Sequence, residues 1–362
     1  MLLFIISPLF LLSLCQPTVT QHSQEVLSHF NNFTMHHKKH YRTPAEKDRR
    51  LAHFAKNHQK IQELNAKARR EGRNVTFGWN KFADKNRQEL SARNSKIHPK
   101  NHTDLPIYKP RHPRGSRNHH NKRSKRQSGD IPDYFDLRDI YVDGSPVVGP
   151  VKDQEQCGCC WAFATTAITE AANTLYSKSF TSLSDQEICD CADSGDTPGC
   201  VGGDPRNGLK MVHLRGQSSD GDYPYEEYRA NTTGNCVGDE KSTVIQPETL
   251  NVYRFDQDYA EEDIMENLYL NHIPTAVYFR VGENFEWYTS GVLQSEDCYQ
   301  MTPAEWHSVA IVGYGTSDDG VPYWLVRNSW NSDWGLHGYV KIRRGVNWCL
   351  IESHAATAMI DN

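Results

Sequence analysis

The sequence predicts an α+β protein with two lobes and a separate helical segment ahead of them. Helix signals dominate residues 158–216, strand-like runs dominate from about residue 250 onward, and a basic segment with its own helix pattern precedes both. Helices followed by strands favour a helical lobe and a β lobe, and a cleft between two lobes is where ligands tend to bind. With 362 residues, the chain is long enough for more than one domain.

The N-terminus begins with an apolar run, MLLFIISPLFLLSLC, that gives way to polar residues. This run is too short for a typical membrane span and is typical of a secretory signal peptide, which we expect over residues 1–16. No later segment is apolar enough to span a bilayer. The predicted destination is the secretory pathway, with lysosomal delivery and release from the cell both open. Four Asn-X-Ser/Thr sequons fit this route and predict glycosylation at Asn32, Asn74, Asn101 and Asn231.

The formal net charge of -5 hides two halves of opposite sign. Residues 1–126 hold 26 Lys+Arg and 8 Asp+Glu, a formal charge of +18, whereas residues 127–362 hold 14 and 37, a formal charge of −23. A secreted protein rarely meets nucleic acid, so we expect no nucleic-acid partner. A basic segment that covers an acidic partner in the same chain is the better interpretation.

The joint between the halves lies in residues 98–126, which are rich in His, Lys, Arg, Asn and Pro. We expect this stretch to be an exposed basic linker, because it has too few apolar side chains to build a core. It ends in Arg123-Ser124-Lys125-Arg126, a dibasic pattern that furin-type convertases cut. The predicted division is therefore a segment 17–126, removed on maturation, and a domain 127–362.

Local signals define several elements. Pro44 and apolar residues at helical spacing predict a helix over 44–71. Ser184 and Glu187 fit a capping box, and Pro205 and Gly216 fit the start and end of another helix. The runs IPTAVYF, SVAIVGYG, YWLVRNSW and GYVKIRR predict strands.

The cysteines cluster unusually at Cys157, Cys159 and Cys160. Nine cysteines remain after the leader, and an odd number in a secreted protein leaves at least one thiol unpaired. A zinc site is disfavoured, because the later pair Cys189-x-Cys191 is too tight for the usual ligand spacing.

A catalytic thiol explains the cluster better. An Ala-rich run follows Cys160, so we expect this residue in the first turn of a helix, where the helix dipole lowers a thiol pKa. His307 stands at the head of a predicted strand, and Asn328 follows the next one. An asparagine amide can accept a hydrogen bond from the imidazole and orient it, with Trp330 and Trp334 shielding that bond.

These residues resemble the papain-like cysteine peptidases, near the cathepsin L and F branch. Cys157-Gly158-Cys159-Cys160-Trp161 fits C-G-[SA]-C-[WY] with a Cys in the [SA] slot, and His and Asn lie far downstream. LSDQEICDC, GCVGGDP, DYPY, AIVGYG and NSW match in order. The ERFNIN pattern of cathepsin L-like propeptides fits Glu46, Arg50, Phe54, Asn57, Ile61 and Asn65, and the GxNxFxD pattern fits Gly78, Asn80, Phe82 and Asp84.

The resemblance implies a papain-like fold, with a helical left lobe and a β-barrel-like right lobe behind a helical inhibitory propeptide. It implies a thiol-dependent endopeptidase made as a latent precursor. Cys160 is the nucleophile, His307 the general base and acid, Asn328 its orienting partner, and Gln154 an oxyanion donor beside the Cys160 N–H. The implied substrate-binding residues are Gly158, Gly202, Gly203, Pro205, Tyr278, Ser308, Trp330 and His354, with Glu305 beside the specificity pocket.

The resemblance also maps three disulfide bonds and leaves two cysteines over. The mapped pairs are Cys157–Cys200, Cys191–Cys236 and Cys298–Cys349. Cys159 and Cys189 either form a fourth bridge or stay reduced. Trp306 departs from the family, which usually has Asp or Asn before the catalytic His.

Two other functions compete with the peptidase. A catalytically silent relative that acts by binding is disfavoured, because the Cys, His, Asn and Gln are all present. A metal-binding secreted protein draws slight support from His36, His37, His40, His119 and His120. We expect no cofactor and no metal, a monomer, and three kinds of partner: peptide or protein substrates, the chain's own propeptide and cystatin-like inhibitors.

Overall fold

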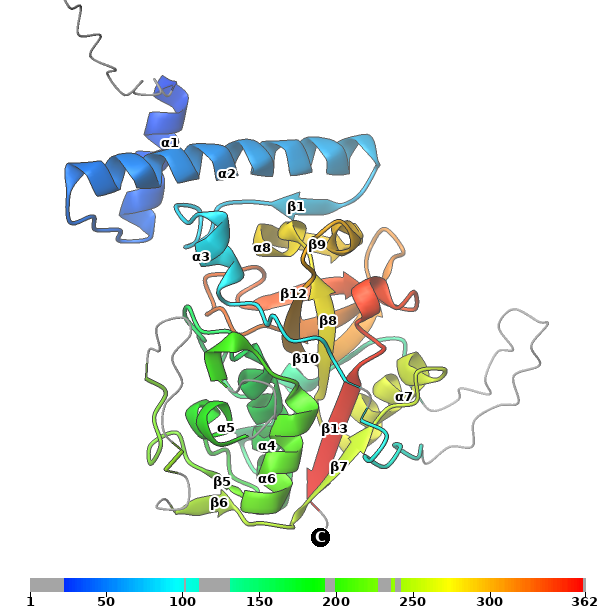
Figure 1. Cartoon of the computed structure of the whole chain (residues 1–362). Helices are drawn as coiled ribbons and strands as arrows, with labels where there is room; N and C mark the ends of the chain where they lie inside the picture. The colour runs from blue at the N-terminus through cyan, green and yellow to red at the C-terminus, as the bar shows by residue number, and fades with distance from the viewer. Residues whose placement is uncertain are drawn as a thin grey trace, which may run out of the picture.

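The computed structural model describes residues 23–100, 102–110, 131–192, 199–226, 236–237 and 242–360. An N-terminal segment of residues 23–110 lies across one end of a two-lobed body and then runs down along it (Figure 1). The predicted leader, the motif at 123–126, Asn101 and Asn231 lie outside the described residues, whereas Asn32 and Asn74 are exposed. Among the helices of the described part, none is long and apolar enough to cross a membrane.

The N-terminal segment is helical, and its long helix confirms the prediction over residues 44–71. The Thr43 side chain caps this helix by accepting a hydrogen bond from the Glu46 N–H, and Pro44 occupies its first turn. Asn86 and Glu89 form a full capping box on a shorter helix. The elements are α1 (Gln24–His36), α2 (Pro44–Arg70), β1 (Val75–Phe77) and α3 (Arg87–Ser91).

The helical lobe surrounds a buried, Ala-rich central helix, α4. The Ser184 hydroxyl caps the next helix by accepting from the Glu187 N–H, and the third helix runs from Pro205 to a C-cap glycine, Gly216, with a φ of 81°. The predicted helix starts are therefore confirmed. The helices are α4 (Cys160–Ser177), α5 (Asp185–Cys191), α6 (Pro205–Arg215) and the short 3-10 turns η1 (Leu137–Asp139) and η2 (Gly199–Val201).

The β lobe is built on one sheet with the strand order β1-β9-β12-β11-β10-β8-β13-β7, and β2 pairs with β10. This order is open at both ends among the described strands, so the expectation of a barrel-like lobe is wrong in that respect. One end of the sheet is β1 of the N-terminal segment, which pairs with β9. The strands are β1 (Val75–Phe77), β2 (Phe135–Asp136), β7 (Leu250–Arg254), β8 (Thr275–Val281), β9 (Tyr288–Leu293), β10 (Glu305–Thr316), β11 (Pro322–Arg327), β12 (Tyr339–Arg343) and β13 (Ala355–Ile360).

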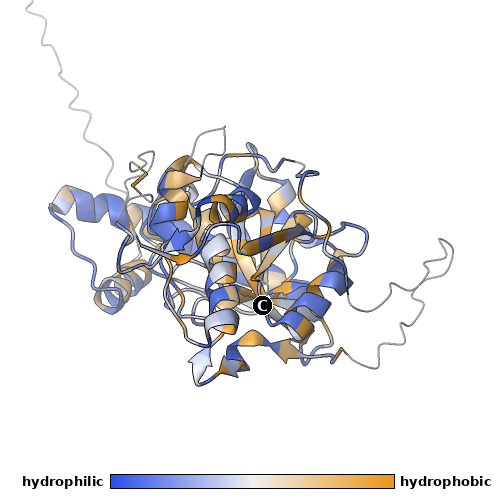
Figure 2. Cartoon of the chain, turned by 90° about the horizontal axis from the view of Figure 1, so that it is seen from below, coloured by the Kyte–Doolittle hydropathy of each residue, from blue (hydrophilic) through white to orange (hydrophobic). Residues whose placement is uncertain are grey.

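Shorter elements complete the fold. Two small ladders lie outside the main sheet, and brief helical turns connect its strands. Hydrophobic residues concentrate on the central strands, and hydrophilic residues dominate the peripheral helices (Figure 2). The remaining elements are β3 (Tyr141–Val142), β4 (Ser145–Pro146), β5 (Gln217–Ser218), β6 (Thr243–Ile245), α7 (Ala260–Glu266), η4 (Asn267–Asn271), α8 (Glu283–Glu286), η5 (Asp297–Tyr299) and η6 (Trp348–Leu350).

The N-terminal segment shares a hydrophobic core with the β lobe. Phe54, Phe77 and Phe82 belong to the same buried cluster as Trp287 and Trp330. The expected exposed linker over 98–126 is wrong for His102, Leu105 and Tyr108, which are buried against the body, whereas residues 103, 104, 106 and 109 are exposed. The backbone around Ile107 pairs with Arg254, so two apolar side chains and a local strand contact fix a stretch whose average composition is polar.

A buried ion cluster joins the two lobes. The Lys152 ammonium lies 2.8 Å from both a Glu170 carboxylate oxygen on α4 and an Asp185 oxygen on α5. Arg327, at the end of β11, lies 3.7 Å from the other Glu170 oxygen. Both carboxylates are almost fully buried, so their charges depend on these two cations.

We expect Lys152→Met to lower the free energy of unfolding by about 3 kcal/mol, because it leaves two buried carboxylates with one cation. Urea unfolding of the precursor measures the change. Lys56→Met, at an exposed position on α2, is the matched control. Equal unfolding midpoints for the two variants would show that the cluster contributes nothing.

Candidate active site

Cys160 is the first residue of α4 and is fully buried. The backbone N–H of Ser308 on β10 donates to its Sγ at 3.3 Å. The expected position in the first helical turn is therefore observed, and the thiol faces the strand that carries His307.

The His307 ring is fixed by hydrogen bonding and by aromatic packing. Its Nε2 lies 2.8 Å from Oδ1 of Asn328, just beyond the end of β11. Its ring lies 4.9 Å from the Trp330 ring and 5.5 Å from the Phe285 ring, measured between centroids. Among the described residues, nothing hydrogen-bonds to the buried Nδ1. With Nε2 engaged, Nδ1 is the ring nitrogen that remains free to exchange a proton.

Burial keeps both groups uncharged in this form of the chain. Desolvation raises the pKa of Cys160 to about 12, against the hydrogen bond from Ser308. Desolvation lowers the pKa of His307 to about 4, and the charge of Arg93 acts in the same direction, against the hydrogen bond to Asn328. The expected lowering of the thiol pKa is not found in the precursor, because burial outweighs the hydrogen bonds from Ser308 and Trp161 that lower it.

Hydrogen bonds that cross from one lobe to the other orient the side-chain amide of Gln154 toward the cleft. Its Oε1 accepts from the Ser329 hydroxyl at 2.6 Å and from the Trp330 indole at 3.2 Å. Its Nε2 donates to the carbonyl of Cys157 at 2.7 Å and to the carbonyl of Arg93 at 2.9 Å. A backbone carbonyl of the N-terminal segment therefore occupies the donor that sequence reasoning assigned to an oxyanion.

Residues 93–95 are buried in the cleft, and Lys96, which follows them, is exposed. The Arg93 guanidinium is buried, 3.6 Å from the centre of the Phe82 ring and 5.1 Å from that of Trp330. Ser95 pairs with Trp306 through two backbone hydrogen bonds of 2.7 and 3.0 Å. This short ladder is the type of contact that an extended peptide makes with the edge of a binding cleft.

The other predicted binding residues are distributed unevenly around this strand. Gly158 and Gly202 lie against it, since an added Cβ would approach the Asn94 carbonyl to 3.3 Å and the Ser95 side chain to 2.1 Å. The Tyr278 hydroxyl lies 2.6 Å from the Ser95 hydroxyl, and the His354 ring lies 5.9 Å from that of Trp306. Gly203 packs instead on the Trp161 ring, and the Pro205 carbonyl accepts from Thr165 inside the helical lobe.

Sequence reasoning missed Glu286, which ends α8 and is buried beside the cleft segment. Its carboxylate lies 2.6 Å from Nη1 of Arg87, and burial raises its pKa to about 7. No motif surrounds Glu286. The cations Arg87, Arg93 and Lys96 could not have pointed to it, because charged side chains in a sequence are usually solvated.

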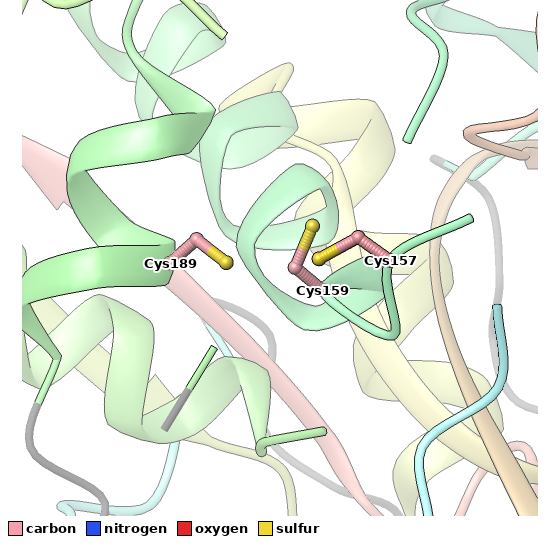
Figure 3. A group of neighbouring side chains, drawn as sticks. All are labelled: Cys157, Cys159 and Cys189. Atoms are coloured by element: carbon pink, nitrogen blue, oxygen red, sulfur yellow. The ribbon is translucent and has the colours of Figure 1, made fainter. Parts of the chain in front are cut away.

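Three disulfide bonds are present: Cys157–Cys200, Cys191–Cys236 and Cys298–Cys349. Cys159 and Cys189 are buried free thiols, as is Cys160. The sulfur atoms of Cys157, Cys159 and Cys189 lie within 4.8 Å of one another and point to a common centre (Figure 3). Because the Cys157 sulfur is bonded to Cys200, this group does not offer three thiolates to a metal.

We expect a chain expressed without residues 1–16 to label at three thiols when it is denatured without reductant and alkylated. Intact mass counts the labels. Cys160→Ala, the control, should show two. A single label on the unsubstituted chain would mean that Cys159 and Cys189 form a fourth bridge, against the free thiols found here.

Two family models match the chain in succession. One, described as the cathepsin propeptide inhibitor domain (I29), matches residues 30–90. The other, described as the papain family cysteine protease, matches residues 131–359. The match boundaries fall on the N-terminal segment and on the two-lobed body, respectively.

Curated relatives and solved structures agree with these matches. The chain is 32% identical to the oryzain gamma chain of Oryza sativa subsp. japonica over 335 residues, which is 91% of this chain and 83% of that protein. It is 31% identical to pro-cathepsin H of Bos taurus over 325 residues, 89% of this chain and 86% of that one.

Among solved structures, digestive procathepsin L 3 of the Tenebrio molitor larval midgut aligns with a TM-score of 0.72 at 26% identity, covering 93% of this chain and all of that one. Digestive procathepsin L2 from the same source aligns with a TM-score of 0.73 at 28% identity, over 92% of this chain and all of that one. The chain belongs to the papain family of cysteine proteases and carries a cathepsin-type inhibitory propeptide ahead of its peptidase domain.

Proposed function

We propose that Cys160 is the nucleophile of this peptidase, His307 its general base and acid, and Asn328 the residue that orients His307. Gln154 and the Cys160 N–H would form the oxyanion site. The observation that carries this proposal is the 2.9 Å hydrogen bond from Gln154 Nε2 to the Arg93 carbonyl, because it shows that the Gln154 amide can hold a peptide carbonyl oxygen.

The proposed reaction follows from these positions. His307 Nδ1 takes the thiol proton, and the Cys160 sulfur attacks the substrate carbonyl carbon, whose oxygen becomes an oxyanion held by Gln154. His307 then gives the proton to the departing amine as the C–N bond breaks. Water, deprotonated by His307, attacks the thioester and releases the acid with the thiol restored. Asn328 keeps the ring in the orientation that both transfers need.

Latency has a steric and an electrostatic part in this proposal. Residues 93–96 exclude substrate from the cleft, and their burial of Cys160 and His307 disfavours the thiolate and imidazolium that the reaction uses. Removal of the propeptide would hydrate both groups and remove the nearby Arg93 charge. Both changes lower the free energy of the charged pair.

Maturation and destination are part of the same proposal. We place the leader at residues 1–16, the propeptide at 17–126 and the mature peptidase at 127–362, with convertase cutting near Arg126. Glycans on Asn32, Asn74, Asn101 and Asn231 and delivery to the lysosome or the cell exterior fit the disulfide-bonded fold. Substrates are peptides or proteins, and cystatin-like inhibitors would compete for the same cleft of a monomeric enzyme.

We expect Cys160→Ala and His307→Ala to abolish peptide hydrolysis, and Gln154→Ala to lower kcat about a hundredfold or more. Each chain is processed by an added convertase at residues 123–126 and assayed with a thiol reductant at acidic pH. Cys159→Ala is the matched control, since it removes the neighbouring buried thiol and keeps the nucleophile. Loss of hydrolysis in Cys159→Ala with activity retained in Cys160→Ala would overturn the assignment.

The pH dependence of latency can be derived from the groups that the propeptide covers. Burial raises the pKa of Glu305, but hydrogen bonds and charges from Ser91, Arg87, Asn94 and Lys96 lower it below the ordinary value of 4.5 overall. A carboxyl whose pKa is lowered by the propeptide strengthens propeptide binding at a pH above its ordinary pKa. This contribution to binding is lost as the pH falls and the carboxyl is protonated.

Two other covered groups respond to the same fall in pH, in opposite directions. His307, with its lowered pKa, also binds fewer protons in the precursor, so acid favours release. Glu286, with its raised pKa, acts in the opposite direction.

We expect Glu305→Gln to shift the midpoint of precursor processing to higher pH by about one unit, because glutamine mimics the protonated carboxyl. Gel analysis of processing between pH 4 and 7 gives the midpoint. Glu296→Gln, at an exposed position of the same domain, is the control. An unchanged midpoint for Glu305→Gln would exclude this carboxylate as a determinant of activation.

A further inference from the structure

Two carboxylates of the peptidase domain share a single propeptide guanidinium. Nη1 of Arg87 lies 2.6 Å from Oε1 of Glu286, and Nη2 lies 2.7 Å from Oε2 of Glu305. Glu286 ends α8 and Glu305 begins β10, so two elements of the β lobe supply the pair. A planar guanidinium carries donors in a rigid fork and can satisfy two separate acceptors at once.

The propeptide supplies the partners of this pair. The side-chain hydrogen bonds and ion pairs that the described residues give to Glu305 come from Arg87, Ser91, Asn94 and Lys96, and that of Glu286 comes from Arg87. Both carboxylates are buried beneath the propeptide. Processing therefore exposes two adjacent carboxylates that have lost their cation, which is a site prepared for another one.

The pair lies within reach of a peptide in the cleft. Trp306, next to Glu305, pairs with Ser95 through the backbone, and the Asn94 side chain donates to Glu305 at 2.8 Å. Asn94 directly follows Arg93, whose carbonyl lies on Gln154. A long side chain from a substrate residue bound close to the reacting carbonyl can therefore reach Glu305.

We propose that Glu286 and Glu305 form an arginine-selective substrate subsite of the processed enzyme, which Arg87 occupies in the precursor. The inference rests on the proposed function of Cys160 and adds a substrate class to it: peptides with arginine close to the cleaved bond. Lysine fits less well, because its ammonium is a compact point charge without the fork that spans two carboxylates.

The test compares peptides that differ only at one residue, which is arginine, lysine or citrulline, at each of three positions on either side of the cleaved bond. Citrulline keeps the shape of arginine and lacks its charge. We expect one position at which kcat/KM for arginine exceeds that for citrulline about tenfold, with lysine between them. Glu305→Gln and Glu286→Gln should reduce this ratio severalfold, and Glu296→Gln should preserve it.

The outcomes separate this inference from the proposed function. Hydrolysis of citrulline and arginine peptides at equal kcat/KM at every position would overturn the subsite and leave the peptidase mechanism intact. Failure to hydrolyse any peptide of the series would overturn the proposed function, and the subsite with it. If a glutamine variant fails to fold, the ratio of kcat/KM for the arginine peptide to that for the citrulline peptide, measured on the unsubstituted enzyme, still decides whether the subsite exists.

Discussion

Burial of Cys160 and His307 beneath residues 93–96 is the constraint on which the precursor depends. In the proposed mechanism both groups need charge to act, and burial shifts the pKa of each toward the neutral form. The same four residues supply the carbonyl on Gln154 and the strand paired with Trp306. The same contact therefore excludes substrate and keeps Cys160 and His307 uncharged. The helices of the propeptide hold this short extended strand in place.

That strand can be held only if the two lobes keep their spacing. Gln154 bonds to Ser329 and Trp330 across the cleft, and Arg327 at the end of β11 pairs with Glu170 on α4. Buried polar contacts of this kind contribute little net stability, but they are expensive to break and so fix geometry. Gln154, the proposed oxyanion donor, thus belongs to the framework that joins the lobes, and its amide is oriented by protein contacts alone.

The sequence was informative where local signals and family motifs were strong. Cys160 at a helix start could be read from the Ala-rich run, and the His307–Asn328 contact requires only that β10 and β11 pair, as they do. The raised pKa of the Cys160 thiol could not be read from the sequence, because it results from the burial of this residue in the folded precursor. Packing of Leu105 and Tyr108 was also hidden, since two apolar residues do not change the composition of a basic linker.

The opposite charges of the two halves predict that the basic segment covers the acidic one, and the structure shows this as short contacts between individual pairs of residues. Lys81 with Asp153 and Lys60 with Glu283 lie near the surface, where salt screens charge within about 8 Å. Arg87 is different, because its two carboxylates are buried. When the Arg87 guanidinium leaves, the two carboxylates remain side by side without a cation and can bind another one. Latency and substrate choice in this enzyme are therefore two uses of one pair of charges.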